Sequence, residues 1–378
     1  MPTKTEKLLK QLIAIPSVNP DGDPGTEHTG EKVIAQFLAE YLKALGAKVK
    51  LTNVEKDRPN LFARFPVKGK VKQRILFAPH SDTVSVAGMT ISPFKPTVKG
   101  GKIYGRGASD TKGPMAAMLT ALAEVTATPE YQNGETEFTF AAFMGEETGC
   151  IGATAFAQTK EAKRYDLAII GEPTSFKMVH AHKGCIWAKV TIPGRAAHAS
   201  IADPAQNANL KMGRVLRAIE NDFLPWLENF PHPVLGLTTA SPNILSGGSK
   251  ANISPQQTEL TIDIRTTPKL PVSKLEKILK QILNQTGTGA KLSMPIAGTA
   301  MHTDPEHPLL QKIKPATRGF DTAPWFCDAA KLAEIGVPAI ALGPGSIKQA
   351  HTKDEWIEVS DLNDGHQRFV KVMHRLLD

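Results

Sequence analysis

Histidine and acidic side chains stand in this sequence at places where short apolar segments end. They are His80 and Asp82 after RILFAP, Glu146 and Glu147 after TEFTFAAFMG, Glu172 after DLAIIG, His351 just beyond VPAIALG, and Asp110 in GRGASDTKG. In open α/β sheets ligands bind at the carboxyl ends of the strands, so we expect these side chains at one edge of a sheet. Because imidazole nitrogen and carboxylate oxygen are donors that catalytic zinc takes, the pattern predicts a metal-dependent hydrolase.

The spacing of these residues suggests a division of roles. His80 and Asp82 lie two apart and point the same way on an extended backbone, which lets Asp82 hold the His80 ring. Glu146 and Glu147 are adjacent, and a turn lets one of them bind a metal while the other faces the substrate water. Two metal ions bridged by a carboxylate and a water need about five protein ligands plus a base, and the sequence supplies that number.

Each of these signals is weak by itself. An HxD pair alone is a poor indicator of a metal site, and two adjacent glutamates usually lie on a solvated surface. Glu172 in GEPT also precedes a turn proline, and His351 alone fits an ordinary loop histidine. The interpretation therefore rests on the joint placement of these residues, in this order, at the ends of apolar segments.

Alternating strand-like and helix-like segments position these residues as far as about residue 181. RILFAPH, TEFTFAAFM and DLAIIG are typical of strands buried on both faces, and KGPMAAMLTALAEVTA is typical of a helix. Residues 182–297 instead show the order β-α-β-β-α-β, which predicts a smaller inserted domain. We expect residues 1–181 and 298–378 to form one α/β domain with a mainly parallel sheet between helices.

The composition is that of an ordinary globular protein and limits the alternatives. The chain has 378 residues, 41% of them apolar, and no segment of membrane-spanning length. Cys150, Cys185 and Cys327 are scattered, which argues against a disulfide framework or a cysteine zinc site. The first residues lack the apolar core of a signal peptide, so we expect a cytoplasmic protein. The net charge of +8 comes without an arginine-rich segment, and we expect neither a nucleic-acid nor a membrane partner.

Several motifs together resemble the di-zinc family of acetylornithine deacetylase, succinyl-diaminopimelate desuccinylase, aminoacylase and glutamate carboxypeptidase. In chain order they are IPSVNP, HSDT, PF followed by IYGRGASDTKG, GEET, GEPT, KG followed by PGRAAHAS, DIR, and GPG followed by AHTKDEWI. The resemblance covers nearly the whole chain, and GRGASDTKG is highly specific. Two departures occur: Thr111 replaces the family's usual methionine, and the short segment VSVAGMTIS lacks the usual tryptophan.

The resemblance implies a role for each candidate residue. The metal ligands would be His80 and Glu172 on one zinc ion, Glu147 and His351 on the other, and Asp110 bridging both. Glu146 would be the general base, and Asp82 would orient His80. The peptide bond between Asp110 and Thr111 would be cis. Cobalt or manganese would suit the same ligands.

The inserted domain would then be a ferredoxin-like lid through which two copies of the chain form a homodimer. His198 matches a lid histidine that stabilises the tetrahedral intermediate, often in the partner's site. Asn252 and Arg265 match lid positions that contact the substrate, and the fork of Arg265 suits a carboxylate. An ion pair at the end of a strand is the alternative for Arg265.

The implied reaction is hydrolysis of an amide bond by a zinc-bridged hydroxide, with Glu146 carrying the proton to the leaving amine. In the family, glutamate at the position of Glu172 accompanies deacylases and carboxypeptidases. The expected substrate is therefore an N-acyl amino acid. A dipeptidase or carboxypeptidase of the same family is the alternative. A non-catalytic ligand-binding homologue is more remote, because no ligand or base is missing.

Overall fold

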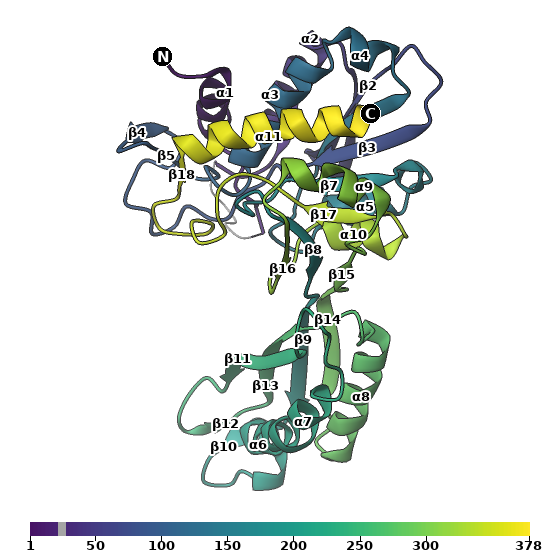
Figure 1. Cartoon of the computed structure of the whole chain (residues 1–378). Coiled ribbons are helices and arrows are strands. Elements are labelled where there is room, and N and C mark those ends of the chain that lie inside the picture. Colours follow the sequence, from purple (N-terminus) through teal and green to yellow (C-terminus); the bar gives the residue numbers. More distant parts are fainter. Residues whose placement is uncertain (22–27) are drawn as a thin grey trace. The chain divides into compact units, whose positions relative to one another are not determined.

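The computed structural model describes residues 1–21 and 28–378. These residues fold into two compact units (Figure 1). The first comprises Met1–His180, His302–Thr322 and Cys327–Asp378, and the second comprises Ala181–Met301 and Ala323–Phe326. The sequence pattern placed the corresponding borders at residues 182 and 297. None of the helices in the described part of the chain combines the length and apolar character needed to span a membrane.

A nine-stranded sheet forms the centre of the first unit. Its strands are β1 (Lys48–Glu55), β2 (Arg58–Phe65), β3 (Gln73–Ala78), β6 (Thr136–Ala142), β7 (Leu167–Ile170), β8 (Met178–His182), β15 (Met301–His302), β16 (Phe320–Ala323) and β17 (Ala339–Ala341). The order is β1-β2-β6-β3-β7-β17-β8-β15, and β16 also pairs with β8. The pairs β6–β3, β3–β7 and β7–β17 are parallel, whereas β1–β2, β2–β6 and β17–β8 are antiparallel. The expected α/β fold is confirmed, with the parallel strands at the centre of a mixed sheet.

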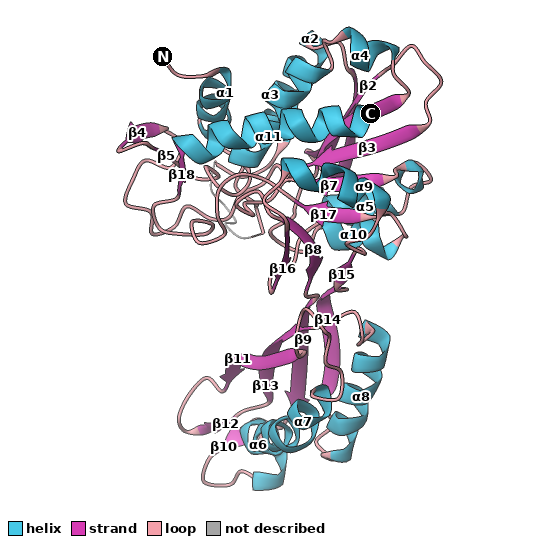
Figure 2. Cartoon of the chain, in the orientation of Figure 1, coloured by secondary structure: helices cyan, strands magenta, loops and turns pink. Residues whose placement is uncertain are grey.

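Helices pack on this sheet, as Figure 2 shows. They are α1 (Lys4–Ile13), α2 (Lys32–Ala44), α3 (Lys112–Val125), α4 (Pro129–Asn133), α5 (Ile151–Ala157), α9 (Pro308–Ile313), α10 (Ala329–Glu334) and α11 (Val359–Leu377). Helix α11 packs against α1 and α3, while α10 packs on β7 and β17. Every residue of β6 is buried, as expected for a strand covered on both faces. A small sheet with the order β18-β5-β4 consists of β4 (Thr97–Lys99), β5 (Lys102–Tyr104) and β18 (Trp356–Glu358).

The parallel strands place the candidate residues at one edge of the central sheet. Strands β3, β6 and β7 run in the same direction and end shortly before His80, Glu146 and Glu172. Asp110 lies two residues before the start of α3, and His351 lies in the segment between β17 and β18. The carboxyl-edge rule for open α/β sheets therefore predicts a ligand site among these residues.

The second unit contains a four-stranded antiparallel sheet with the order β11-β13-β9-β14. Its elements in chain order are β9 (Cys185–Pro193), β10 (Ala197–His198), α6 (Ala208–Ala218), α7 (Leu224–Leu227), β11 (Thr239–Gly247), β12 (Ile253–Ser254), β13 (Gln257–Arg265), α8 (Val272–Gln285) and β14 (Lys291–Gly298). Side chains of β13 alternate between buried and more exposed, as in a sheet with one face on a core. Without the short pair β10–β12 and with α7 continuing α6, the order is βαββαβ, as predicted from the sequence.

Candidate metal centre

Asp110 lies between two histidines in the first unit. Its Oδ1 is 3.1 Å from Nε2 of His80, and its Oδ2 is 3.3 Å from Nε2 of His351. The hydrogen bonds to the histidines hold the pKa of Asp110 below its usual value, although burial raises it. Its two oxygens thus face donors from different parts of the chain, which is the arrangement a bridging carboxylate requires.

Glu147 contacts the second of these histidines. Its Oε2 lies 3.0 Å from Nε2 of His351, and hydrogen bonds from Asp110 and Glu147 raise the pKa of His351 to about 10. Ligand-type atoms of His80, Asp110 and Glu147 all lie within 4.8 Å of one another. Within residues 1–21 and 28–378 this is the one group of three or more such side chains that is compact enough to hold a metal ion.

The carboxylate of Asp82 organises the surroundings of His80. Its Oδ1 lies 3.4 Å from Nδ1 of His80, and the same ring nitrogen is 3.0 Å from the backbone carbonyl oxygen of Asp82. The carboxylate also accepts the backbone N–H groups of Glu146 and Glu147, both at 3.1 Å. Asn19 donates to its Oδ2 at 2.7 Å. These bonds leave Nε2 of His80 directed at Asp110, so the geometry gives Asp82 the means to orient the ring.

Two further acidic groups lie at the same sheet edge, Glu146 partly buried and Glu172 buried. Burial raises the pKa of Glu146 well above its usual value, and the charges of Glu172 and Glu147 raise it further. Burial and the charge of Asp110 likewise raise the pKa of Glu172. One carboxylate oxygen of Glu172, Oε1, is buried without a hydrogen-bond partner in the described residues.

These observations fit divalent metal ions. Buried carboxylates that repel one another, and a buried oxygen without a donor, are costly unless a positive charge compensates them. A bound cation is the largest local charge in such a site and satisfies both needs. The donors are imidazole nitrogens and carboxylate oxygens, which suit zinc, cobalt and manganese.

Comparison with known proteins agrees with this chemistry. The sequence model of Peptidase family M20/M25/M40 matches residues 76–375. Acetylornithine deacetylase from Shigella sonnei is 31% identical to this chain over 390 residues, an alignment that covers 97% of this chain and 96% of that protein. The chain belongs to peptidase family M20/M25/M40. The family and the deacetylase relative make it a hydrolase.

Solved structures of the M20 family share its fold. An M20 family metallo-carboxypeptidase from Sulfolobus solfataricus superposes with a TM-score of 0.85 at 16% identity, covering 99% of this chain and 100% of the other. A Bacillus subtilis protein described as a dinuclear metal binding peptidase from the M20 family gives a TM-score of 0.66 at 13% identity, with coverages of 99% and 98%. At these identities the similarity establishes the fold, and the expected family resemblance is confirmed.

The departure from the M20 pattern at Thr111 has a structural counterpart. The Asp110–Thr111 peptide bond is cis, as expected, and Thr111 occupies the position before α3. Its hydroxyl does not cap the helix but donates to the carbonyl oxygen of His80 at 3.1 Å. The replacement thus adds a hydrogen bond between the two segments that carry His80 and Asp110.

Sequence reasoning missed three buried polar residues at this centre. Asn19 lies in IPSVNP and Glu355 in AHTKDEWI, motifs that indicated the M20 family but gave these two residues no role. Asp328, at the start of α10, has no exposed surface. Burial raises its pKa to about 7. A charged residue inside an apolar stretch, as in FCDAAKLA, was the available signal for Asp328.

Two of the predicted lid residues lie near each other in the second unit. His198 in β10 pairs with Ile253 in β12, and the N–H of Ala199 donates to the carbonyl oxygen of Asn252 at 3.0 Å. Nδ1 of His198 lies 2.8 Å from the hydroxyl oxygen of Ser200 and 3.3 Å from the backbone nitrogen of the same residue. These contacts hold the ring on one side and leave Nε2 on the other side of this exposed side chain.

Arg265 forms a paired contact within its own strand. Its Nε and Nη2 donate to the two carboxylate oxygens of Asp263 at 2.7 and 2.9 Å. This is the strand-end ion pair that the sequence left open as an alternative. Nη1 makes no hydrogen bond to another described residue, so one edge of the guanidinium is left for a further acceptor.

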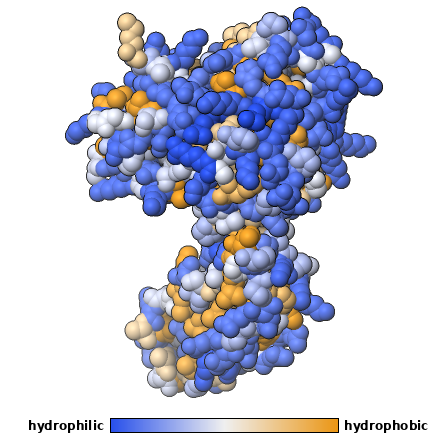
Figure 3. All heavy atoms as spheres, viewed as in Figure 1, coloured by the Kyte–Doolittle hydropathy of each residue, from blue (hydrophilic) through white to orange (hydrophobic). Residues whose placement is uncertain are grey.

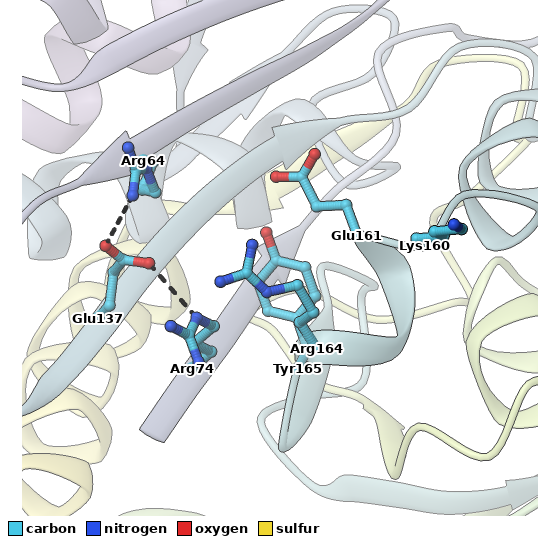
Figure 4. Close-up of a pocket in the computed structure, with 7 residues that line it drawn as sticks. All are labelled: Arg64, Arg74, Glu137, Lys160, Glu161, Arg164 and Tyr165. Carbon is cyan, nitrogen blue, oxygen red and sulfur yellow. Dashed lines mark hydrogen bonds and ion pairs between the residues drawn. The ribbon is translucent and has the colours of Figure 1, made fainter. Parts of the chain in front are cut away.

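A cavity of about 380 Å³ lies at the opposite edge of the central sheet, near the amino ends of β3 and β6 (Figure 4). In Figure 4, Glu137 stands between Arg64 and Arg74, at 3.3 and 3.7 Å from their nitrogens. The other lining residues are Lys160, Glu161, Arg164 and Tyr165. Its acidic groups are balanced by arginines and it contains no histidine, so it lacks the donor set of the metal centre.

Proposed function

We propose that this M20 protein hydrolyses the amide bond of an N-acyl amino acid. The observation that carries the proposal is the end-to-end similarity to acetylornithine deacetylase, at 31% identity over 97% of the chain. Such substrates have an acylated nitrogen and a free α-carboxylate. The buried acids and histidines at the sheet edge supply the groups that hydrolysis of such an amide needs.

The proposed metal ligands divide into two sets that share Asp110. His80 and Glu172 would hold one ion, Glu147 and His351 the other. The contacts of the two Asp110 oxygens with different histidines support this division. Divalent ions held by these residues would polarise the scissile carbonyl and lower the pKa of a bound water, and zinc is the proposed metal.

Glu146 is the proposed general base. It follows β6 at the same sheet edge as the ligands, and the N–H that Asp82 accepts fixes its backbone. Burial raises the pKa of its carboxyl, which suits a group that takes a proton from water and returns it to the leaving amine near neutral pH. His198 would donate from Nε2 to the oxygen of the tetrahedral intermediate, because its Nδ1 already contacts Ser200.

Arg265 and Asn252 are the proposed contacts for the substrate in the second unit. An arginine that already shares two donors with Asp263 keeps Nη1 for a substrate carboxylate. The ion pair with Asp263 limits the flexibility of the Arg265 side chain, which lowers the entropic cost of binding a substrate. The exposed amide of Asn252 would provide a second polar contact close to His198.

The second unit is also the proposed lid and dimer contact. Strand β11 is an edge strand, and Ile244 and Leu245 expose 62% and 56% of their surface. Figure 3 shows apolar side chains on the surface of this unit. A long exposed edge strand with apolar side chains is a ready site for pairing with another strand. We propose that the enzyme is a homodimer in which the β11 strands of the two copies pair with each other. We also propose that it is a cytoplasmic enzyme.

A carboxypeptidase is the competing function. The M20/M25/M40 family is named for peptide hydrolysis, which makes a peptidase of this family the alternative. The two activities share the chemistry and differ in the group that precedes the scissile amide: a simple acyl group for the deacylase and a peptide for the carboxypeptidase.

Amine release from a substrate panel distinguishes these functions. The panel contains N-acetyl and N-succinyl amino acids with basic, acidic and apolar side chains, together with dipeptides and acyl-dipeptides. We expect zinc-loaded protein to cleave one N-acyl amino acid fastest and chelator-treated protein to cleave none. Preferred cleavage of the peptides would replace the deacylase by the peptidase. No cleavage by protein that holds its metal would contradict both.

A further inference from the structure

Glu355 lies buried against the turn that carries Asp110. Its side chain is 1% exposed. Oε2 accepts the backbone N–H of Gly107 at 2.9 Å, while Oε1 accepts those of Ser109 and Asp110 at 2.8 and 2.9 Å. A single carboxylate therefore binds three amides of one short turn, including that of the proposed bridging ligand.

Arg106 pairs with Glu355 and extends its contacts. Nη1 donates to Oε2 of Glu355 at 2.9 Å and to the carbonyl oxygen of Thr352 at 3.3 Å, and Nη2 donates to that of Ser85 at 2.9 Å. The Arg106 side chain is itself 3% exposed. This ion pair connects the segment after His80, the turn before Asp110 and the segment after His351.

The turn surrounds this carboxylate with backbone donors. The N–H groups of Gly107, Ser109 and Asp110 converge on it and form a concavity for an anion, which here is a side chain of the same protein. Gly107 has a φ of +82°, and a Cβ there would lie 2.9 Å from Cδ of Lys112. Without the Glu355 carboxylate, three amides and the Arg106 guanidinium would lose a buried acceptor, which favours a different turn.

We propose that Glu355 is a positioning residue of the metal centre. By fixing the turn that ends at Asp110, it sets the place of the Asp110 carboxylate between His80 and His351. Its location four residues after His351 means that one side chain couples ligands from two distant parts of the sequence. The proposal rests on the proposed function in one respect, that these residues bind metal.

The test compares Glu355→Gln with Glu358→Gln. Glutamine carries an NH₂ group in place of one carboxylate oxygen. Each oxygen of Glu355 accepts two N–H donors, so in either orientation this NH₂ group would face two donors without accepting from them. Glu358 is a matched control in the same segment, because its side chain is 36% exposed and lies 3.7 Å from Nζ of Lys102. Amide hydrogen exchange over residues 105–111 is measured on metal-free protein. Cobalt(II) affinity is measured by chelator competition, and the visible spectrum of the cobalt-loaded protein reports ligand geometry.

In Glu355→Gln we expect the amide hydrogens of residues 105–111 to exchange at least about tenfold faster than in the wild type. We also expect cobalt binding to be about 10–100-fold weaker, the usual effect of losing a residue that orients metal ligands. Its cobalt spectrum should also change, whereas Glu358→Gln should match the wild type in all three measurements. Wild-type exchange, affinity and spectrum in Glu355→Gln would overturn the proposal.

Arg106→Lys provides a second variant if Glu355→Gln does not fold. Lysine keeps the charge but cannot donate along the fork to Glu355, Ser85 and Thr352 together. Faster exchange of residues 105–111 with weaker cobalt binding supports the proposal, and unchanged values contradict it. A wild-type protein that binds no cobalt would contradict the proposed function instead, and the exchange comparison in metal-free protein would still decide the role of Glu355.

Discussion

The carboxylate of Asp82 accepts the backbone N–H of Glu146 at 3.1 Å. The same carboxylate lies 3.4 Å from Nδ1 of His80 and accepts the N–H of Glu147. One buried side chain thus fixes the end of β3 relative to the segment that follows β6. In this structure Asp82 contacts a proposed ligand on one side and the proposed base on the other.

Replacing Asp82 by asparagine should weaken both connections. Asparagine has one acceptor oxygen where the wild type has two, so the N–H groups of Glu146 and Glu147 compete for it. We expect metal affinity to fall about 10–100-fold, as is typical for a residue that orients a ligand. Metal competition with a chelator measures this. The exposed Asp222→Asn serves as control, and equal affinities of the two variants would argue against the role of Asp82.

Replacing Glu146 by glutamine should remove proton transfer and leave the metal bound. The amide has similar size but cannot accept a proton, and general-base catalysis contributes about 10²–10⁴-fold. We expect kcat to fall by at least about 10²-fold at unchanged metal content, with the exposed Glu40→Gln as control. Near-normal turnover in a Glu146→Gln variant that holds its metal would exclude this residue as the base.

Metal binding should release protons near neutral pH. In the metal-free protein the pKa of His351 is raised to about 10 by Asp110 and Glu147, so its ring carries a proton at pH 7. A metal takes the neutral ring, so affinity should increase as the pH rises toward 10, about tenfold per pH unit for each proton released. Calorimetry in two buffers of different ionisation enthalpy measures the release. An affinity that is constant between pH 6 and 9 would contradict the prediction.

The fold and the candidate site were predictable to different degrees. Apolar segments identified β3, β6 and β7 because strands buried on both faces require continuous apolar sequence. The sequence did not reveal that β2 pairs antiparallel with β6, because strand pairing depends on contacts between distant residues. Helix α3 was expected over KGPMAAMLTALAEVTA and spans Lys112–Val125, since the helix propensity of such a segment is a local property.

Residues that support the site through tertiary contacts escaped prediction. Glu355 and Asn19 act on segments far away in the sequence, and neither their type nor their spacing shows which backbone amides or carboxylates they meet. The pair of Arg265 and Asp263 was within reach, because side chains two apart on a strand lie on the same face. The positions of His198, Asn252 and Arg265 in a working site stay predictions.

A charge on strand β11 should separate the proposed dimer. Ile244→Lys places a cation on the exposed edge strand, where it would face its own copy across the pair. Light scattering coupled to size-exclusion chromatography should show a halved mass. Leu51→Lys on β1, an exposed edge strand of the central sheet, is the matched control. A halved mass for Leu51→Lys alone would place the dimer contact on β1, and a monomeric wild type would exclude the dimer.

Titration of metal-free protein with zinc, with amine release from the preferred N-acyl amino acid as readout, tests the central claim most directly. We expect no activity after chelation and full recovery that saturates at about two zinc equivalents per chain, as a site with two ligand sets sharing Asp110 requires. Undiminished hydrolysis by protein shown to hold no metal would contradict it.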